Sequence, residues 1–260
     1  MPGYAELKKA FDSLGIADNP VIVHASLRKF GNIDGGARTV IQAILASFSG
    51  VVVPAFTYKT MITPEVGPPN NGLNYGSDKD NNKMAESFRP DMPPDKMMGT
   101  LPLTLLHEKN VLRTSHPILS FAGIRADEIL RTQTLFDPLA PIRELEEKDG
   151  WVVLINVDNT VNTSIHYGEK LAGRRQFVRW AMMPGRIVEC PGFPGDSSGF
   201  HAIDEYISPY TCRVDMGKEA FIQALPVKRL LDATVEMIKK DPLALLCQRV
   251  DCERCNAVRI

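Results

Sequence analysis

The stretch that decides the fold is Trp151-Val152-Val153-Leu154-Ile155-Asn156-Val157-Asp158-Asn159-Thr160-Val161-Asn162-Thr163-Ser164-Ile165-His166-Tyr167-Gly168-Glu169. Residues 151–157 form the most apolar strand candidate in the second half of the chain, and a polar turn at 158–160 follows them. A strand that leads through a polar turn into a helix with a histidine is a common way to build an active site. The stretch therefore predicts a strand, a turn and a helix that carries chemistry.

The predicted helix carries a histidine and a glutamate in its first two turns. Asn162, Thr163 or Ser164 can cap it, because a short side-chain oxygen accepts an unpaired N–H group of the first turn. Glu169 follows His166 by three residues and shares its helical face, so a carboxylate can orient the imidazole or hold its charge. A lone histidine in a helix is also often a packing or surface residue, so a catalytic role needs support from elsewhere in the chain.

The composition is that of an ordinary globular protein. The chain has 260 residues, of which 44% are hydrophobic and 23% charged, and its formal net charge is −1. This length suits one large α/β domain or two small ones, and we expect a single domain over residues 1–260. A near-neutral charge without blocks of one sign argues against a nucleic-acid or membrane-surface partner.

The N-terminus predicts a cytoplasmic protein. Residues 1–10 are polar and lack the basic end and apolar run of a signal peptide. No apolar run approaches the roughly 18 residues that a membrane span needs. Five cysteines in a chain of this size do not describe a disulfide framework. Oligomeric state is not readable from these patterns.

The first strand candidate, 20–28, is apolar along its length and becomes polar at its end. Such a run is typical of a strand buried on both faces, and its end delivers His24, Ser26 and Arg28 to a sheet edge. A helix with apolar residues at helical spacing opens after Gly35-Gly36-Ala37. Bare N–H groups and the positive end of a helix dipole there suit an anion such as a diphosphate, although a glycine pair also serves plain turns.

A second buried strand is predicted at 50–58, with Thr57 and Tyr58 at its exit. Residues 59–98 then form a long, proline-rich segment with little periodicity, which is more typical of a functional loop or lid than of core. Its carboxylates either face a cationic substrate or belong to a solvated loop. They are Asp78, Asp80, Glu86, Asp91 and Asp95.

The rest of the chain alternates between helix and strand patterns. Helices are predicted at 4–14, 99–110, 126–132, 141–148, 201–207 and 227–240, and strands at 113–123, 176–183 and 185–190. This alternation predicts a layered α/β domain with an antiparallel element around 176–190. A cysteine-containing segment, 241–260, ends the chain.

Five ordered blocks of residues together resemble the aminoglycoside 3-N-acetyltransferase family. The blocks are Val23-His24-Ala25-Ser26-Leu27-Arg28, then Gly31 with Gly35-Gly36-Ala37 and Thr39-Val40, then Val53-Pro54-Ala55-Phe56-Thr57, then Arg113-Thr114-Ser115-His116-Pro117 with Ser120-Phe121-Ala122, and finally Asn162-Thr163-Ser164-Ile165-His166 with Glu169. They span roughly residues 20 to 175, and five blocks in one order are far more specific than any single block.

The resemblance implies a three-layer α/β/α fold with a central mixed sheet, distinct from the small N-acetyltransferase fold. It also implies acetyl-coenzyme A as donor, a cationic aminoglycoside amine as acceptor, His166 as catalytic base and Glu169 as its neighbouring carboxylate. Coenzyme A is expected at the exit of the first strand, at the glycine-pair helix start and at the Arg-x-Ser-x-His-Pro block. These positions are Ser26, Leu27, Arg28, Gly35, Gly36, Ala37, Arg113, Ser115 and His116.

The sequence departs from the family pattern in loop 134–141 and in segment 59–98, and the spacing of one block also differs. In the Arg-x-Ser-x-His-Pro block no residue separates Ser115 from His116. The family's Gly-Glu/Asp-Gly-Ser-Pro-Leu-like loop reads Thr134-Leu135-Phe136-Asp137-Pro138-Leu139-Ala140-Pro141 here, without the serine and glycines. Segment 59–98 has no residue-level match, so the family's drug specificity does not transfer.

Acetyl transfer to an amine needs an uncharged amine, a polarised thioester carbonyl and a donor held in reach. We expect His166 to take the proton from the amine, directly or through water, while Glu169 holds the imidazole. Backbone N–H groups, or the hydroxyl of Thr57 or Ser26, are expected to meet the oxyanion. His24 is either a second polar group of the site or a structural histidine at a strand end.

Two other functions remain open at this level. One keeps the donor and changes the acceptor to a different amine metabolite or biosynthetic intermediate. The other is a coenzyme A-binding protein without transferase activity, which would not need both His166 and Glu169.

The C-terminal cysteines raise the question of a metal. Cys247, Cys252 and Cys255 are spaced by four and two residues, and the last two form the close pair that structural zinc sites use. Cys190 or Cys212 is expected to complete four ligands. The alternative is three reduced thiols near a helix end.

Overall fold

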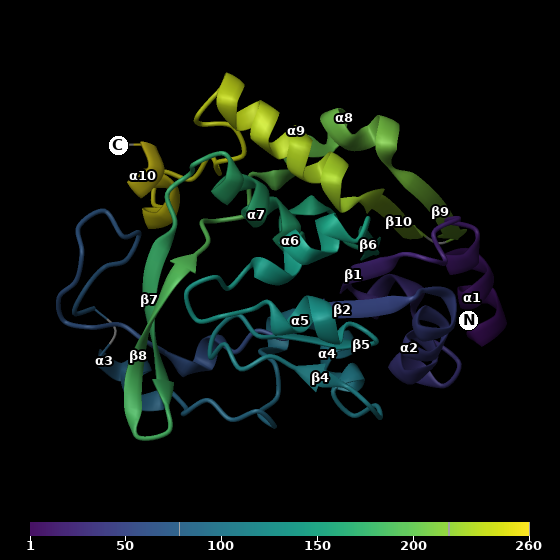
Figure 1. Cartoon of the computed structure of the whole chain (residues 1–260), viewed down its shortest axis with the longest axis horizontal. Helices are drawn as coiled ribbons and strands as arrows, with labels where there is room; N and C mark the ends of the chain where they lie inside the picture. The colour runs from purple at the N-terminus through teal and green to yellow at the C-terminus, as the bar shows by residue number, and fades with distance from the viewer. Residues whose placement is uncertain (78, 218, 260) are drawn as a thin grey trace.

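A mixed β-sheet forms the centre of the molecule (Figure 1). The structure, a computed structural model, describes residues 1–77, 79–217 and 219–259. Across the sheet the strand order is β4-β5-β2-β1-β6-β10-β9. In chain order these strands are β1 (Pro20–Ala25), β2 (Gly50–Pro54), β4 (Leu112–Arg113), β5 (Phe121–Ile124), β6 (Trp151–Ile155), β9 (Cys212–Gly217) and β10 (Ala220–Pro226).

The three central strands, β2, β1 and β6, run parallel to one another. Val21 lies opposite Val51, and His24 lies opposite Leu154. Strands β5 and β10 pair antiparallel with β2 and β6 on either side. Because parallel strands are buried on both faces, β1, β2 and β6 have continuously apolar sequences instead of alternating ones.

Helices cover both faces of the sheet. Side chains alternate between the faces, so Val21 and Val23 pack into one layer whereas Ile22 packs into the other. The first layer contains α1 (Tyr4–Asp12), α2 (Gly36–Ser47) and α4 (Thr100–Leu105), and the second contains α5 (Asp127–Arg131), α6 (Ala140–Glu147), α7 (Thr163–Leu171) and α9 (Val227–Lys240). The predicted three-layer α/β/α fold with a mixed sheet is confirmed.

The predicted antiparallel element around 176–190 belongs to a second, smaller sheet. Strands β7 (Phe177–Met183) and β8 (Arg186–Phe193) form a hairpin, and β3 (Met61–Ile62) pairs with β7. This hairpin lies at the opposite end of the molecule from α1 and α2 (Figure 1). Strand β3 comes from the long segment 59–98, so part of that segment is sheet.

The structure corrects the strand prediction in two places. Residues 113–123 form two antiparallel strands, β4 and β5, because a turn intervenes. The His116 imidazole Nδ1 accepts hydrogen bonds from the backbone N–H groups of Ile118 (3.2 Å) and Leu119 (3.0 Å), which stabilises this turn. Strands β9 and β10 were not predicted, although they complete the sheet beside β6.

Segment 59–98 is held to the body of the protein along its length. It contains β3 and the helix α3 (Lys79–Met84). The N–H of Phe88 donates to the carbonyl of Met182 (2.9 Å), and the N–H of Asp95 donates to the carbonyl of Phe56 (2.7 Å). The Asn71 side chain pairs with both backbone groups of Val178. The expected irregular loop is therefore anchored through its backbone to β7 and to the exit of β2.

In the described part of the chain, none of the helices has the length and apolarity that crossing a membrane requires.

Two further helices are α8 (Asp204–Ile207) and α10 (Glu253–Arg259). Helix α10 lies near the C-terminus beside β7 (Figure 1).

Candidate active site

The carboxyl ends of β1, β2 and β6 meet at one edge of the sheet, which is where ligands bind in folds of this kind. Asn156, directly after β6, joins three strands there. Its side-chain amide donates to the carbonyl of Ser26 (3.1 Å), and its side-chain oxygen accepts from the N–H of Phe221 (2.7 Å). Its φ of 57° lies in the left-handed region, which asparagine tolerates better than most residues.

Helix α7 starts from the same edge and is capped as predicted. The side-chain oxygen of Asn162 accepts from the N–H of Ser164 (3.2 Å), so Asn162 is the capping residue among the three candidates. Asn162 in turn donates to Asn159 (2.8 Å), and Asn159 donates to the carboxylate of Asp204 (2.8 Å). This chain of side chains fixes the start of α7 and hence the direction of its first turn.

The predicted His166–Glu169 pair is present in α7. The His166 Nδ1 lies 2.7 Å from Glu169 Oε2, and both residues are buried, with 9% and 1% of their surface exposed. The other carboxylate oxygen of Glu169 accepts from the Arg174 guanidinium at 2.7 Å. Glu169 therefore has a partner on each oxygen, which makes its burial as a charged group tolerable.

Arg174 connects this pair to the C-terminal segment. Its second terminal nitrogen donates to the backbone carbonyls of Pro242 (2.8 Å) and Ala244 (2.7 Å). Sequence reasoning missed Arg174. The signal available was its place in the Gly173-Arg174-Arg175 turn that ends α7, but nothing there showed which of two adjacent arginines turns inward.

The contacts of His166 define which ring nitrogen is available for chemistry. Because Nδ1 faces a carboxylate, it carries a proton and donates it, which leaves Nε2 with a lone pair. The Phe200 ring lies against the imidazole with an edge contact, at a centroid distance of 4.7 Å. The ring is thus held on two sides, and a lone pair remains on the nitrogen that can accept a proton.

His24 lies on β1, beside the strand that leads to α7. It shares the sheet face of Ile22, which is the face that α7 covers. Its Nε2 is buried and has no hydrogen-bond partner among the described residues. Burial lowers the pKa of His24 to about 3, so the imidazole is neutral near physiological pH.

Two of the expected site residues turn into the fold. Thr57 is fully buried, and its hydroxyl donates to the carbonyl of Pro117 at 2.6 Å. Its proton is therefore engaged in holding the β4–β5 turn against the exit of β2, and an oxyanion would have to compete with the Pro117 carbonyl for it. His116 is 4% exposed with its Nδ1 engaged in the same turn, and burial lowers its pKa to about 4.

Arg113 was expected to contact coenzyme A, but its guanidinium is already occupied. It donates to the carbonyls of Ala55 (2.9 Å), Pro90 (3.1 Å) and Met92 and to the hydroxyl of Ser120 (3.2 Å). These acceptors lie in segment 59–98 and around the β2 exit. Arg113 therefore binds backbone groups that join the long segment to the sheet, and few donors remain for a phosphate.

The remaining expected cofactor residues lie at accessible positions. Arg28, Gly35, Gly36 and Ser115 are exposed, and Ser26, Leu27 and Ala37 are partly buried. Gly35 and Gly36 precede and start α2 with φ values of 73° and 67°. A Cβ atom on Gly35 would lie 2.3 Å from the hydroxyl of Thr39, so this position has no room for a side chain.

The carboxylates of segment 59–98 are mostly paired with nearby basic residues. Asp78 lies outside the described residues. Ion pairs join Asp80 to Lys83 (2.9 Å), Glu86 to Lys59 (3.1 Å) and Asp91 to Arg89 (3.6 Å), whereas Asp95 accepts from the N–H of Met97. A cationic acceptor would have to compete with these local partners.

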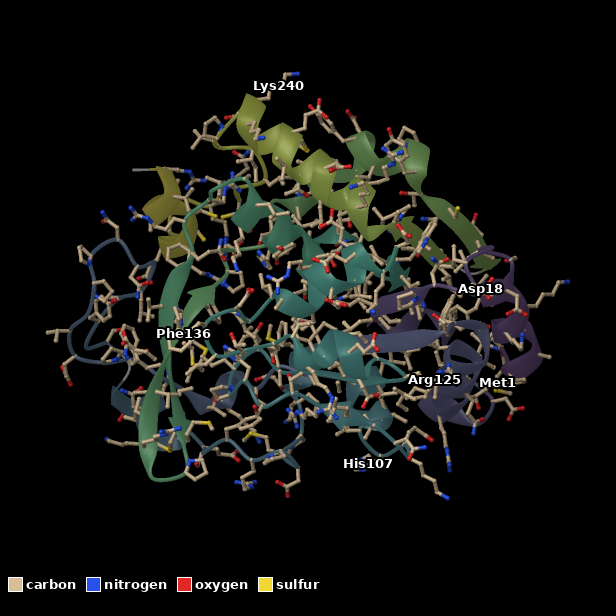
Figure 2. All side chains as sticks on the ribbon, viewed as in Figure 1. Met1, Asp18, His107, Arg125, Phe136 and Lys240 are labelled. Carbon is tan, nitrogen blue, oxygen red and sulfur yellow. The ribbon has the colours of Figure 1, made fainter. Side chains whose placement is uncertain are left out.

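The loop 134–141, which departs from the family pattern, is fastened to two helices. Asp137 pairs with Lys170 of α7 (2.7 Å) and Arg143 of α6 (2.9 Å), and its pKa is lowered because these two cations outweigh the effect of burial. Phe136 beside it is 76% exposed (Figure 2). Charged and aromatic side chains thus stand where the family has serine and glycines.

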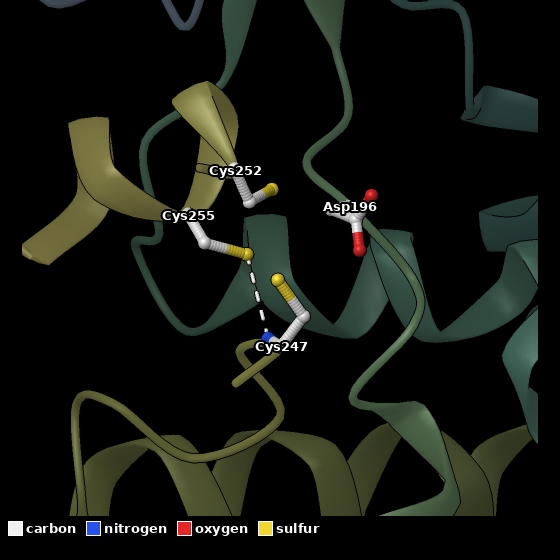
Figure 3. Close-up of side chains that lie close together, drawn as sticks. All are labelled: Asp196, Cys247, Cys252 and Cys255. Atoms are coloured by element: carbon white, nitrogen blue, oxygen red, sulfur yellow. Dashed lines mark hydrogen bonds between the residues drawn. The ribbon is translucent and has the colours of Figure 1, made fainter. Parts of the chain in front are cut away.

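The C-terminal cysteines converge with a carboxylate instead of a fourth cysteine. The ligand atoms of Asp196, Cys247, Cys252 and Cys255 all lie within 4.8 Å of one another, and all four residues are buried (Figure 3). Cys190 lies within strand β8, outside this group, and Cys212 is exposed on β9. Asp196 was missed because nothing in its local sequence, Gly195-Asp196-Ser197, marks it as a ligand.

A surface pocket of about 670 Å³ lies between α9 and the C-terminal segment. Its lining includes Ala202, Met237 and Leu245, and among the described residues it does not include His166. The pocket therefore does not coincide with the sheet edge that carries the His166–Glu169 pair.

The model of one protein family, described as aminoglycoside 3-N-acetyltransferase, matches residues 22–239. The chain therefore belongs to this family. Among curated relatives, aminoglycoside N(3)-acetyltransferase IX from Micromonospora chalcea is 28% identical over 180 residues, which cover 66% of this chain and 63% of the relative. Aminoglycoside N(3)-acetyltransferase IV from a Salmonella species is 28% identical over 65% of this chain and 59% of its own length. The chain thus spans about three fifths of the length of these relatives.

Solved structures of related proteins have the same fold. The apoenzyme of aminoglycoside acetyltransferase AAC(3)-IVa matches 98% of this chain and 96% of its own, with a TM-score of 0.79 and 23% identity. The YokD protein from Bacillus subtilis matches 93% of this chain and 94% of its own, with a TM-score of 0.79 and 19% identity. AAC-IIIb in a binary complex with CoASH matches 92% of this chain and 96% of its own, with a TM-score of 0.73 and 19% identity.

Substitution of Arg174 by methionine is expected to destabilise the fold by about 3–5 kcal/mol, because it leaves one Glu169 oxygen buried without a counter-charge. Urea unfolding of the purified variant measures this loss. The matched control is Arg175→Met at the neighbouring exposed position, for which we expect a change within about 0.5 kcal/mol. Equal stability of the two variants would contradict the role assigned to Arg174.

The buried His24 predicts a dependence of stability on pH. The unfolded chain binds a proton at His24 near pH 6.5, whereas the folded chain does so only near pH 3. The free energy of unfolding is therefore unaffected by His24 above pH 6.5. It falls toward pH 4 by up to about 1.4 kcal/mol per pH unit, because the unfolded chain binds this proton and the folded chain does not. In His24→Leu the unfolding free energy should fall less steeply with pH, because one fewer proton is taken up on unfolding. His107→Leu, at an exposed position (Figure 2), should leave the slope unchanged. Unfolding free energies measured between pH 4 and 7 test this role. If they fell equally with pH in His24→Leu and in the wild type, His24 would not be the cause.

Proposed function

We propose that this chain transfers the acetyl group of acetyl-coenzyme A to the 3-amino group of an aminoglycoside. The observation that carries the proposal is the buried His166–Glu169 pair at the sheet edge, in a chain of this family. The amine nitrogen attacks the thioester carbonyl carbon, the carbon–sulfur bond breaks, and coenzyme A leaves as the thiol. One proton has to leave the amine for each acetyl group that is transferred.

His166 accepts that proton at Nε2. An amine of pKa about 8–10 is mostly protonated near neutral pH, so the step needs a proton acceptor, and an imidazole nitrogen with a free lone pair can serve as one. Glu169 fixes the tautomer through Nδ1 and stabilises the imidazolium that forms, and Arg174 holds Glu169 in place through its other carboxylate oxygen.

We expect the donor to bind at the exit of β1 and at the start of α2. Arg28 is exposed beside this exit. The N–H of Gly36 already donates to the carbonyl of Ile33 (3.0 Å), so a diphosphate would meet the N–H groups that follow it in the first turn of α2. The complex of AAC-IIIb with CoASH supports coenzyme A as the ligand of this fold. With the Thr57 hydroxyl engaged by Pro117, backbone N–H groups or Ser26 are the remaining candidates to contact the oxyanion.

A second candidate keeps this chemistry and changes the acceptor to a different amine metabolite or biosynthetic intermediate. The ion pairs of Asp80, Glu86 and Asp91 favour it, because these carboxylates already have local cations. The chain also spans only part of the length of its curated relatives.

Substitution of His166 by alanine should lower kcat for acetyl transfer by about 10²–10⁴-fold while leaving acetyl-coenzyme A affinity within a few fold, because only the proton acceptor is lost. Thiol release from acetyl-coenzyme A with an aminoglycoside panel measures kcat, and calorimetric titration measures donor binding. His107→Ala, at an exposed position, is the matched control and should retain full activity.

The same assay separates the candidates for the acceptor. Thiol release that requires a free 3-amino group on the aminoglycoside supports the proposal. Release with other amines but with none of the aminoglycosides supports the second candidate. Full activity of His166→Ala would exclude His166 as the base.

A further inference from the structure

We propose that Asp196, Cys247, Cys252 and Cys255 bind a structural zinc ion that fastens the C-terminal segment beside His166. Three sulfur atoms and one carboxylate oxygen form a closed set of four ligands, and zinc accepts both kinds of atom. In a tetrahedral site with zinc–sulfur bonds of about 2.3 Å, ligand atoms lie about 3.8 Å apart. The observed separations, all within 4.8 Å, need only small shifts to reach this geometry.

The surroundings of the cluster are those of ligands held for a metal. The backbone N–H of Cys247 donates to the sulfur of Cys255 at 3.4 Å (Figure 3). The N–H of Ser198 donates to Asp196 Oδ1 at 3.0 Å. Hydrogen bonds of this kind orient ligand atoms and stabilise their charged forms. Packing of three neutral thiols would not require a buried carboxylate among them.

The charges near the cluster also balance with zinc present. Three thiolates, one carboxylate and Zn²⁺ together carry a charge of about −2. Two guanidinium groups compensate this charge, because Arg249 and Arg254 each approach Asp196 Oδ2 at 3.1 Å. Arg254 also donates to the carbonyl of Gly195 at 3.0 Å, which holds it in this position.

The four ligands come from three segments, two of which lead to contacts with the His166–Glu169 pair or with Arg174. Asp196 lies in the loop that leads to Phe200, the ring that contacts His166. Cys247 follows the segment whose Pro242 and Ala244 carbonyls bind Arg174. The last two ligands are Cys252, directly before α10, and Cys255, in its first turn.

Gly199 lets the loop and the C-terminal segment meet closely. A Cβ atom there would lie 2.5 Å from the carbonyl oxygens of Leu245 and Leu246. A metal bound by Asp196 and Cys247 therefore fixes the segment that holds Arg174 and the loop that holds Phe200, and both contact the active-site pair.

Metal analysis of the tag-free wild-type chain tests the proposal directly. We expect about one zinc ion per chain, whereas Cys252→Ser and Cys255→Ser should each retain less than about a tenth of that amount. Cys212→Ser removes an exposed thiol outside the cluster and should keep full occupancy. Wild-type protein that contains no zinc and takes up none on titration would overturn the site, as would a disulfide found among the three cysteines.

Cobalt substitution covers the case in which a cysteine variant does not fold. The wild-type chain loaded with Co²⁺ should show intense thiolate-to-cobalt absorption together with the visible bands of a tetrahedral site. Asp196→Asn should shift these bands and weaken metal affinity by at least about 10-fold. An unchanged spectrum and affinity in that variant would exclude Asp196 as a ligand. These readouts do not depend on acetyl transfer, so they remain decisive even if the proposed reaction is wrong.

Discussion

A single buried carboxylate, that of Glu169, connects His166 to Arg174 and, through Arg174, to the C-terminal segment. One of its oxygens holds His166, and the other holds Arg174, which continues to the carbonyls of Pro242 and Ala244. A buried charge of this kind is tolerated only when its partners are all in place. The orientation of the imidazole therefore depends on the position of a segment more than 70 residues further along the chain.

Several residues of the family blocks make contacts that hold the fold together. Thr57, Arg113 and His116 stand in the blocks that reveal the family, yet their polar groups bind backbone atoms around the exit of β2. Their contacts tie segment 59–98 and the β4–β5 turn to the sheet edge. The reason is geometric: an active-site edge is made of strand ends and turns, whose backbone groups lack ladder partners and need side chains to satisfy them.

The C-terminal segment contacts the His166–Glu169 pair through Arg174, which binds Glu169 and the carbonyls of Pro242 and Ala244. The C-terminal segment packs against the loop that carries Phe200, and the cluster of Asp196 with three cysteines lies where these two segments meet. The short helix α10 has little core of its own, and the proposed metal would compensate for the apolar burial that it lacks.

The sequence by itself determined the apolar parallel strands, the long helices, the capped helix start at 162–164 and the pairing of His166 with Glu169. These features depend on periodicity and on neighbours three or four residues apart, which a sequence displays directly. Only the tertiary structure decided that Arg174 completes the pair, that Asp196 and not Cys190 joins the cysteines, and that β9 and β10 extend the sheet. Each of these depends on which distant segments lie side by side, and the chain folds them together through burial that no local pattern specifies.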